Sequence, residues 1–348
     1  MILLIIIPSL ENSGPIKGAL AIYNLLESHF KAKLIVLKKN SGNTVNLPKK
    51  IELIDLSKMN FIHKFLFIRR YCKVNKNIKI ISICFSADIL NLFSGSKVEK
   101  ICSIRGNLIK NYKYHYPYIG KIIAIFHLFL QRFYTHSIVM NRSMYLQVQK
   151  YANKKPIIIK NFIDEKSLNK FFKEVSPFSK VIKYIYVGTL TSRKGIDILL
   201  EAFKQISHKN FVHLDIVGDG PLKKTIKNKI NQLSLKKKVT LHGYKRLPYK
   251  LIANSDVFVL PSYSEGTSRA LLEALFLGIP AVIRDVDGNS ELKKNKNIYL
   301  FKKNNELENA MIQQAIYSKS RKYRNNLLPK SYREKSIIKS YLNLLRNK

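Results

Sequence analysis

The sequence of 348 residues contains no tryptophan and few acidic side chains. It has 22 Asp and Glu residues against 62 Lys and Arg residues, which gives a formal net charge of +40. Such a charge attracts polyanions, phosphorylated small molecules and anionic lipid surfaces, and it does not select one of them. Lys, Ile and Asn are abundant, a bias typical of an AT-rich genome, so the charge alone says little about function.

Cysteine and metal-binding patterns are also scarce. Cys72, Cys84 and Cys102 show no CxxC spacing, which predicts reduced, buried thiols in a cytoplasmic protein. The eight histidines form no H-x-H or HExxH pattern, so we expect no metal site and no cofactor. The N-terminal MILLIIIPSL lacks a basic lead and stops at Pro8, which favours a buried strand over a signal peptide or a membrane span.

Strand and helix patterns alternate along the chain, which predicts parallel sheets covered by helices. Expected strands of the first half are Ile2–Ile7, Ala32–Leu37, Ile51–Leu56, Lys79–Phe85, Lys100–Ile104 and Ser137–Met140. Those of the second half are Tyr184–Gly188, His213–Gly218, Val239–His242, Val257–Pro261 and Ala281–Arg284. Expected helices include Gly18–Phe30, Ile196–Ile206, Leu222–Leu233, Leu247–Ala253 and Ser268–Leu277. Each half predicts one Rossmann-like unit.

The polar interruption at Asn161–Lys183 predicts the join between two domains. We expect a first domain over residues 1–165 and a second domain over residues 180–329. The basic segment Arg321–Lys348 has a helical pattern, and a helix at about 330–348 can pack back on the first domain. Ligands of open α/β sheets bind at the carboxyl ends of the strands, so we expect a cleft between the two sheets.

The stretch SEGTSRALLEALFLGIP, residues 264–280, predicts a buried helix that contains one carboxylate, Glu273. Glu265 lies eight residues earlier, and Thr267 or Ser268 can cap the helix. Free backbone N–H groups at this helix start favour an anion such as phosphate, and Glu273 can then accept hydrogen bonds from ribose hydroxyls. Alternatively, Glu273 pairs with a core Lys or Arg.

The second half resembles the retaining glycosyltransferases of the GT-B fold, family 4, also called glycosyl transferase group 1. The resemblance rests on YVGTLTSRKGIDILLEAF, IVGDGP, LHGY and DVFVLPSYSEGTSRALLEALFLGIPAV. It is weakest in the first half. It implies that the first domain, residues 1–165, is on the acceptor side and that the second, residues 180–329, binds the nucleotide sugar. KNFID, residues 160–164, resembles the N-G-x-D segment of the family, with Phe162 where Gly is usual.

The resemblance implies roles for single residues. Glu273 binds the nucleotide ribose, and Glu265 lies beside the donor sugar. Lys194 matches the cation on the donor diphosphate. The usual Arg position holds Thr189, and the neighbouring Arg193 either supplies that charge or is a solvated surface residue.

The remaining binding residues that the resemblance implies are spread over both domains. Gly14 lies in the loop that approaches the donor phosphates and the acceptor, and Arg105 binds a phosphate or forms a structural ion pair. In the second domain the helix start and the end of a strand supply the others, namely Gly266, Thr267, Ser268 and Tyr244. Asp285 and Asp287 spell the D-x-D metal motif of another glycosyltransferase fold, and we expect no metal there.

The function that we predict is transfer of a hexose from a nucleotide sugar, with UDP the first choice, to a saccharide acceptor without a metal. A lipid-linked intermediate of bacterial O-antigen, capsule or lipopolysaccharide synthesis is the expected acceptor. Two basic, aromatic-rich stretches, Phe61–Tyr71 and Ile119–Tyr134, favour a cytoplasmic enzyme that is peripheral on the anionic inner face of the plasma membrane. The alternatives are a GT-B epimerase, a sugar phosphorylase or a nucleic-acid-binding protein. No nucleic-acid motif supports the last.

Overall fold

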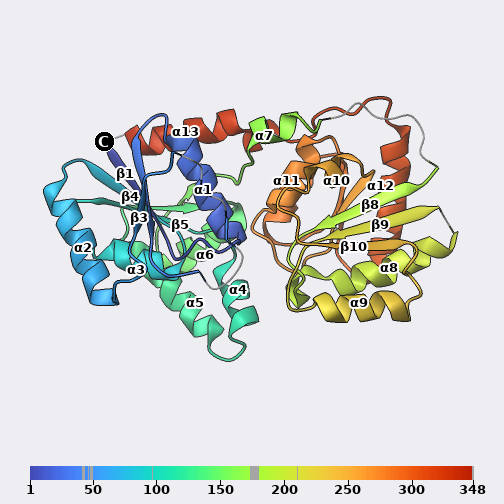
Figure 1. Cartoon of the computed structure of the whole chain (residues 1–348), viewed down its shortest axis with the longest axis horizontal. Helices are drawn as coiled ribbons and strands as arrows, with labels where there is room; N and C mark the ends of the chain where they lie inside the picture. The colour runs from blue at the N-terminus through green and yellow to red at the C-terminus, as the bar shows by residue number, and fades with distance from the viewer. Residues whose placement is uncertain are drawn as a thin grey trace. The chain divides into compact units, whose positions relative to one another are not determined.

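The structure is a computed structural model, and it describes residues 1–40, 44–45, 47, 50–95, 97–172, 180–209 and 211–346. The chain divides into two compact units. The first combines Met1–Phe162 with Glu334–Lys348, and the second is Ile163–Arg333. Each unit is a parallel sheet covered by helices (Figure 1).

The first unit has a seven-stranded sheet in the order β3-β2-β1-β4-β5-β6-β7. Its strands are β1 (Ile2–Ile7), β2 (Lys31–Val36), β3 (Leu53–Asp55), β4 (Ile78–Ser82), β5 (Glu99–Ser103), β6 (His136–Val139) and β7 (Ile157–Ile158). Its helices are α1 (Gly14–Leu26), α2 (Phe61–Val74), α3 (Phe85–Leu92), α4 (Leu108–His115), α5 (Gly120–Phe129), α6 (Arg142–Ala152) and α13 (Glu334–Arg346). A 3-10 turn, Leu130–Phe133, continues α5.

The apolar run of β1 is divided between the two faces of this sheet. Leu3, Ile5 and Ile7 pack in one cluster with α1 and α13, whereas Leu4 and Ile6 pack in another with α2 and α3. Successive side chains of a strand point to opposite faces, so an uninterrupted apolar strand requires cover on both. The C-terminal helix α13 supplies part of that cover through side chains such as Tyr341 and Leu345.

The second unit has a six-stranded sheet in the order β10-β9-β8-β11-β12-β13. Its strands are β8 (Ile182–Val187), β9 (Val212–Val217), β10 (Val239–Gly243), β11 (Val257–Leu260), β12 (Ala281–Arg284) and β13 (Ile298–Phe301). Its helices are α7 (Glu165–Asn169), α8 (Ile196–Lys209), α9 (Lys223–Gln232), α10 (Tyr249–Ala253), α11 (Arg269–Phe276) and α12 (Leu307–Ser320). The strand order reverses between β8 and β11, which makes their carboxyl ends the switch point where ligands of such sheets bind.

The two Rossmann-like units and the parallel sheets are confirmed, but three expectations about elements were wrong. The short strand β7 and the edge strand β13 were not expected. The first helix begins at Gly14 rather than Gly18. Arg321–Arg333 is irregular apart from one 3-10 turn at Lys330–Tyr332, because its polar groups bind other parts of the unit: Arg321 donates to the Gly278 carbonyl, and the Leu327 N–H donates to the Leu275 carbonyl.

Among the described residues, no helix combines the length and the apolar character that a membrane crossing requires.

Candidate functional site

The loops that follow β8 and β11 are bound to each other at the switch point of the second unit. The Tyr263 N–H donates to the Arg193 carbonyl at 2.9 Å. Gly195 adopts φ +64°, and a Cβ there would lie 2.7 Å from the Pro261 carbonyl oxygen. The glycine therefore allows the two loops to approach closely, and a larger residue would force them apart.

The GDGP turn after β9, residues 218–221, requires its two glycines for backbone packing. A Cβ on Gly218 would lie 1.8 Å from the Gly188 carbonyl oxygen, and one on Gly220 would lie 2.6 Å from the Leu190 carbonyl oxygen. Both residues also have positive φ. This turn fixes the position of the loop after β8, which contains Lys194.

Lys194 and Glu265 form a buried ion pair across the two loops. Lys194 Nζ lies 2.5 Å from Glu265 Oε1, and the side chains are 11% and 8% exposed. Burial alone would raise the pKa of Glu265, but the positive charges of Lys194 and Arg193 outweigh it and hold that pKa below its usual value. From the sequence we expect Lys194 and Glu265 to contact the donor separately, and their spacing along the chain does not indicate that they pair.

Arg193 is neither a solvated surface charge nor an unbound cation. Its side chain is half-buried, and its Nη1 donates to the Ser264 carbonyl at 2.5 Å. The Ser264 hydroxyl in turn donates to Asp287 Oδ2 at 2.8 Å. The carbonyl is neutral and does not offset the positive charge of Arg193. That charge therefore helps to lower the pKa of Glu265.

The start of α11 has the capping geometry that the sequence predicted. Ser268 is the N-cap, and its hydroxyl accepts a hydrogen bond from the Leu271 N–H. Thr267 is buried, and Gly266 is half-buried beside it. The N–H groups of the first helical turn therefore point toward the carboxyl edge of the sheet, where an anion is favoured.

Glu273 is the partly exposed position between Leu271 and Phe276 of α11. Leu271, Leu272, Ala274, Leu275 and Phe276 are buried, whereas Glu273 is half-exposed. Burial and then the charge of Glu273 raise the pKa of Tyr249, which places that carboxylate near the tyrosine. The buried carboxylate with a lysine partner is thus Glu265, and Glu273 keeps access to solvent.

Arg284, at the end of β12, supports the loop after β11. Its Nε donates to the Pro261 carbonyl at 3.1 Å, and Nη1 and Nη2 donate to the Lys302 carbonyl and Asn304 Oδ1. The guanidinium also lies 4.6 Å from the centre of the Tyr263 ring. Our sequence reasoning missed this residue, although a charged side chain within the apolar run PAVIR was a signal.

The two carboxylates of the D-x-D sequence are held by different serines. Asp285 Oδ1 accepts from the Ser290 hydroxyl at 2.5 Å, and Asp287 Oδ2 accepts from Ser264. Asp287 has φ +45°, in the left-handed region that is unusual for a residue with a side chain. Asp287 therefore serves as an anchor of the loop that contains Glu265.

Three other candidates belong to loops that follow other strands, one in the second unit and two in the first. Tyr244 follows β10 and is 39% exposed. In the first unit, Gly14 begins α1, and a Cβ there would meet no atom within 4 Å. Arg105 Nη2 donates to Asn161 Oδ1 at 2.8 Å, and its guanidinium lies against Gly18 of α1. Arg105 thus attaches the KNFID segment to the first unit.

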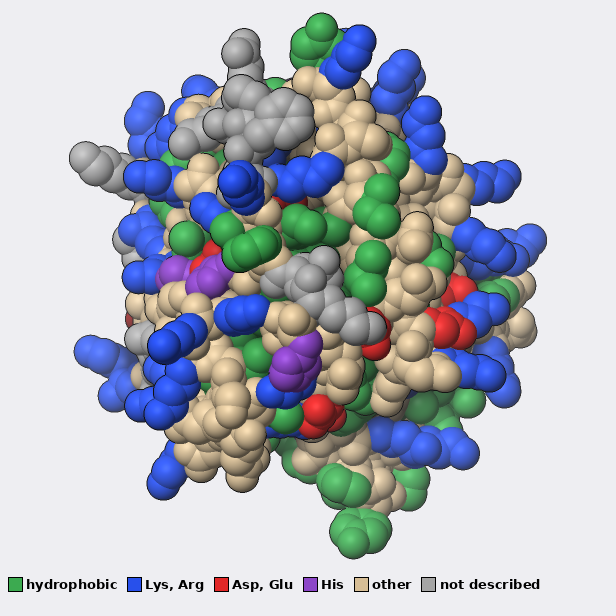
Figure 2. Space-filling view, turned by 90° about the vertical axis from the view of Figure 1, so that its right-hand side faces the viewer, with side chains coloured by type: hydrophobic (Ala, Val, Ile, Leu, Met, Phe, Trp, Pro, Cys, Tyr) green, Lys and Arg blue, Asp and Glu red, His purple; other side chains and the backbone are tan. Residues whose placement is uncertain are grey.

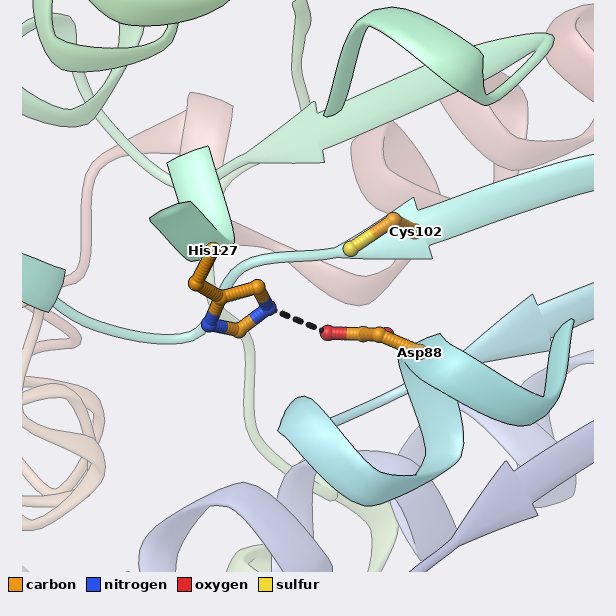
Figure 3. A group of neighbouring side chains, drawn as sticks. All are labelled: Asp88, Cys102 and His127. Atoms are coloured by element: carbon orange, nitrogen blue, oxygen red, sulfur yellow. Dashed lines mark hydrogen bonds and ion pairs between the residues drawn. The ribbon is translucent and has the colours of Figure 1, made fainter. Parts of the chain in front are cut away.

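A polar cluster that no sequence pattern indicated lies inside the first unit. Asp88 of α3, Cys102 of β5 and His127 of α5 are buried and point toward one another (Figure 3). His127 Nε2 lies 2.7 Å from Asp88 Oδ2, which is a hydrogen-bond separation, whereas tetrahedral zinc would hold its N and O ligands about 3.4 Å apart. Tyr112 of α4 hydrogen-bonds His127 Nδ1, and burial raises the pKa of the Cys102 thiol. The cluster therefore fastens α4 and α5 to the sheet.

Basic side chains are scattered over the face of the molecule in Figure 2, with few acidic ones among them. They do not gather into one stripe on that face. The second unit therefore shows no basic groove there of the kind that follows a nucleic-acid backbone.

Comparisons with known proteins show glycosyltransferases that are similar to this chain. An uncharacterised glycosyltransferase of Methanocaldococcus jannaschii is 27% identical over 73% of this chain and 64% of its own length. The UDP-Gal:α-D-GlcNAc-diphosphoundecaprenol α-1,3-galactosyltransferase of Escherichia coli is 37% identical over 32% of this chain and 30% of its own length. The chain thus spans less than two thirds of either relative.

Solved structures share the fold. HepE of Anabaena, in complex with UDP and glucose, superposes with a TM-score of 0.77 at 16% identity and covers 99% of both chains. This likeness confirms the GT-B fold. The model of the family described as glycosyl transferases group 1 matches residues 146–332, more than half of the sequence. The chain therefore belongs to the glycosyl transferases group 1 family.

Proposed function

We propose that this protein transfers a hexose from a UDP-sugar to a saccharide acceptor and retains the anomeric configuration. The observation that carries the proposal is the junction of two loops at the switch point of the second unit. There the buried pair Lys194–Glu265 lies next to the N–H groups at the start of α11, with Glu273 two turns further along the helix.

Each part of this junction suits one part of a nucleotide sugar. The helix start and the charges of Lys194 and Arg193 stabilise the diphosphate, whose negative charge grows as it leaves. Glu273 accepts hydrogen bonds from the ribose diol. Glu265 lies beside the donor sugar, and its bond to Lys194 holds it ionised and in place. Gly266, Thr267 and Ser268 shape the cradle, and Tyr244 adds a contact at the end of β10.

The reaction that this arrangement supports needs no covalent intermediate on the protein. The bond from the anomeric carbon to the diphosphate breaks while the acceptor oxygen bonds on the same face of the sugar. The acceptor proton passes to the departing phosphate oxygen, so the products are UDP and the extended saccharide. The protein acts by positioning both substrates and by stabilising the leaving group.

The choice of donor and acceptor draws on the relatives. The Escherichia coli relative is named for a UDP-galactose donor and a diphosphoundecaprenol-linked acceptor. A Campylobacter jejuni relative, 32% identical over 133 residues, is likewise named for a diphospho-undecaprenol substrate. We therefore propose a lipid-linked saccharide of bacterial surface polysaccharide synthesis as acceptor, and a peripheral location on the inner face of the plasma membrane. In the first unit, Gly14 and Arg105 lie at the strand ends where we place acceptor contacts.

A thermal-shift panel of UDP-, GDP-, ADP- and dTDP-sugars tests the donor. A donor at 100 times its dissociation constant should stabilise the fold by about 2.7 kcal/mol, and we expect this of a UDP-sugar. Incubation with donor alone separates the rival activities, because an epimerase converts the donor without any acceptor. If no nucleotide sugar shifts the melting temperature, while single-stranded DNA binds at physiological salt, the proposal is wrong.

A further inference from the structure

Helix α5 and the 3-10 turn after it bury two polar side chains, His127 and Gln131, and expose four large apolar ones. Gly120, Ala124, His127, Leu128 and Gln131 are buried against the first unit. The opposite face consists of Ile122, Phe126, Phe129 and Phe133, all exposed. Their spacing of four, three and four residues places them in one stripe along the helix.

The buried hydrogen bonds of His127 and Gln131 explain why the apolar face of α5 is exposed. His127 bonds to Asp88 and Tyr112, and the Gln131 side chain donates to the His127 carbonyl and accepts from the Ser137 hydroxyl. These bonds hold the side of α5 that contains His127 and Gln131 against the first unit. The stripe must then face away from the unit, although burying large apolar side chains is normally favourable.

The turn between α4 and α5 continues the apolar surface. Tyr118 is 96% exposed and Ile119 is 56% exposed, and the α4–α5 hairpin extends away from the sheet in Figure 1. Tyrosine is enriched where water meets the hydrocarbon region of a bilayer, and phenylalanine is common on the apolar face of helices that lie in that interface. Six apolar side chains on one projecting hairpin exceed the scattered single residues that are normal on a protein surface.

The charge around the hairpin indicates which partner covers it. Between Glu99 and Asp164 the sequence contains eleven Lys and Arg residues and no Asp or Glu. Lys113, Lys121 and Arg132 are exposed on the hairpin, and the Arg132 guanidinium lies 5.1 Å from the centre of the Phe129 ring. Apolar side chains flanked only by cations complement a bilayer with anionic headgroups.

We propose that the α4–α5 hairpin is the membrane-binding surface of this protein, and that it inserts the stripe and Tyr118 into the headgroup region of an anionic bilayer. This rests on the proposed function, because a lipid-linked acceptor must be met at a membrane. It also narrows the expectation from the sequence, which gave α2 and α5 equal weight. Helix α2 also exposes large apolar side chains, namely Phe61, Ile62, Leu66 and Val74, but their spacing spreads them around the helix instead of placing them in one stripe. Arg69 and Arg70 are exposed among them.

Vesicle flotation of the full chain tests the surface. The probes are vesicles of phosphatidylglycerol and phosphatidylcholine, and vesicles of phosphatidylcholine alone. Phe126→Ser with Phe129→Ser should lower partitioning into the anionic vesicles at least tenfold. Lys113→Ser, Lys121→Ser and Arg132→Ser together should lower it about 100-fold at low salt, since each charge near such a surface contributes about fivefold. These residues are exposed, so unchanged melting temperatures are expected.

Matched controls lie in the second unit. Phe211→Ser with Ile316→Ser removes two exposed apolar side chains, and Lys224→Ser, Lys236→Ser and Lys237→Ser remove three exposed charges. Both control variants should float like the unaltered protein. Equal losses in hairpin and control variants would show that only net charge or overall hydrophobicity matters, and the proposal would be overturned.

The absence of tryptophan gives a second, independent readout. Tyr118→Trp places a single fluorophore at the tip of the hairpin, and Phe211→Trp places one in the second unit as a control. Anionic vesicles should shift the emission of the first to shorter wavelength and leave the second unchanged. No shift at Tyr118→Trp, or a concentration-dependent dimer that Phe126→Ser with Phe129→Ser dissociates, would overturn the proposal in favour of solvent or a second copy.

The proposed function is measured separately in the same proteins, through UDP affinity without vesicles and transfer to a soluble acceptor analogue. If the hairpin variants and the unaltered protein bind UDP equally and neither floats, the membrane surface is wrong and the transferase proposal stands. If the unaltered protein floats but binds no nucleotide, the transferase proposal is wrong and the membrane surface stands.

Discussion

Lys194 Nζ and Glu265 Oε1 lie 2.5 Å apart, although 71 positions separate the residues in the sequence. Each belongs to a different loop at the switch point of the second sheet, and both side chains are almost fully buried. The pair therefore holds the two loops together and keeps Glu265 ionised at the site that we propose for the donor sugar.

Replacing one member of the pair should destabilise the second unit. Lys194→Met leaves the Glu265 carboxylate buried without its partner, which typically costs about 3–5 kcal/mol. For a unit of this size that corresponds to a fall in melting temperature of roughly 6–20 °C. Lys194→Met combined with Glu265→Leu should regain most of the loss in calorimetry. A double variant as unstable as the sum of the single ones would contradict a direct interaction.

The same pair predicts a pH dependence. The pKa of Glu265 is lower in the folded protein than in the unfolded chain, where it is about 4.3. The pair therefore stabilises the fold above that pH, and this contribution is lost as the pH falls through the folded-state pKa. Melting temperatures of the unaltered protein should drop between about pH 5 and pH 3 more steeply than those of Glu265→Gln. Parallel curves would exclude a depressed pKa.

Glu273→Ala should weaken nucleotide binding and leave the fold intact. The side chain is half-exposed, so little packing is lost, whereas hydrogen bonds to a ribose diol are worth about 1.5–3 kcal/mol. Calorimetric titration with UDP should show a dissociation constant about 10- to 150-fold higher. The exposed Glu27→Ala in the first unit serves as control. Normal UDP affinity together with a much lower melting temperature would identify Glu273 as a structural residue instead.

Arg284→Lys tests the support of the loop after β11. A lysine can keep one of the three hydrogen bonds of the guanidinium, and each bond from a charged group contributes about 1.5–3 kcal/mol. We expect a lower melting temperature and a lower kcat/KM for transfer, because Pro261 and Tyr263 lose their support. Lys322→Ala, a change of an exposed residue in the same unit, is the control. An unchanged kcat/KM in Arg284→Lys would show that the loop is positioned without it.

Transfer should continue in the presence of EDTA. Asp285 and Asp287 bind different serine hydroxyls, and the diphosphate has Lys194, Arg193 and the start of α11 as its proposed cationic partners. Assays with and without EDTA should therefore give the same rate. Activity that is lost in EDTA and returns with Mg²⁺ or Mn²⁺ would place a metal in the reaction.

The sequence predicted local structure better than contacts. Both ends of β12 were predicted correctly, because Pro280 and Asp285 lie directly before and after its apolar run. The cap of α11 at Ser268 followed from the local preference for serine at that position. The Lys194–Glu265 pair could not be predicted, since local patterns do not say which loops meet. The exposed apolar stripe of α5 could not be predicted from the sequence for another reason. A helix that is apolar almost all round has no periodicity to show which side is buried.

The place of α13 in the first unit has a consequence for synthesis. Residues 334–346 are the last described part of the chain, yet their Ile337, Tyr341, Leu344 and Leu345 cover the same core as Leu3 and Ile5. A ribosome must therefore produce all of the second unit before the first can close. A nascent chain that ends near residue 330 should display an uncovered apolar face and attract chaperones, which ribosome-bound chains of increasing length would reveal. For the same reason the second unit is an insertion within the first, and exchanging it between relatives requires two crossovers.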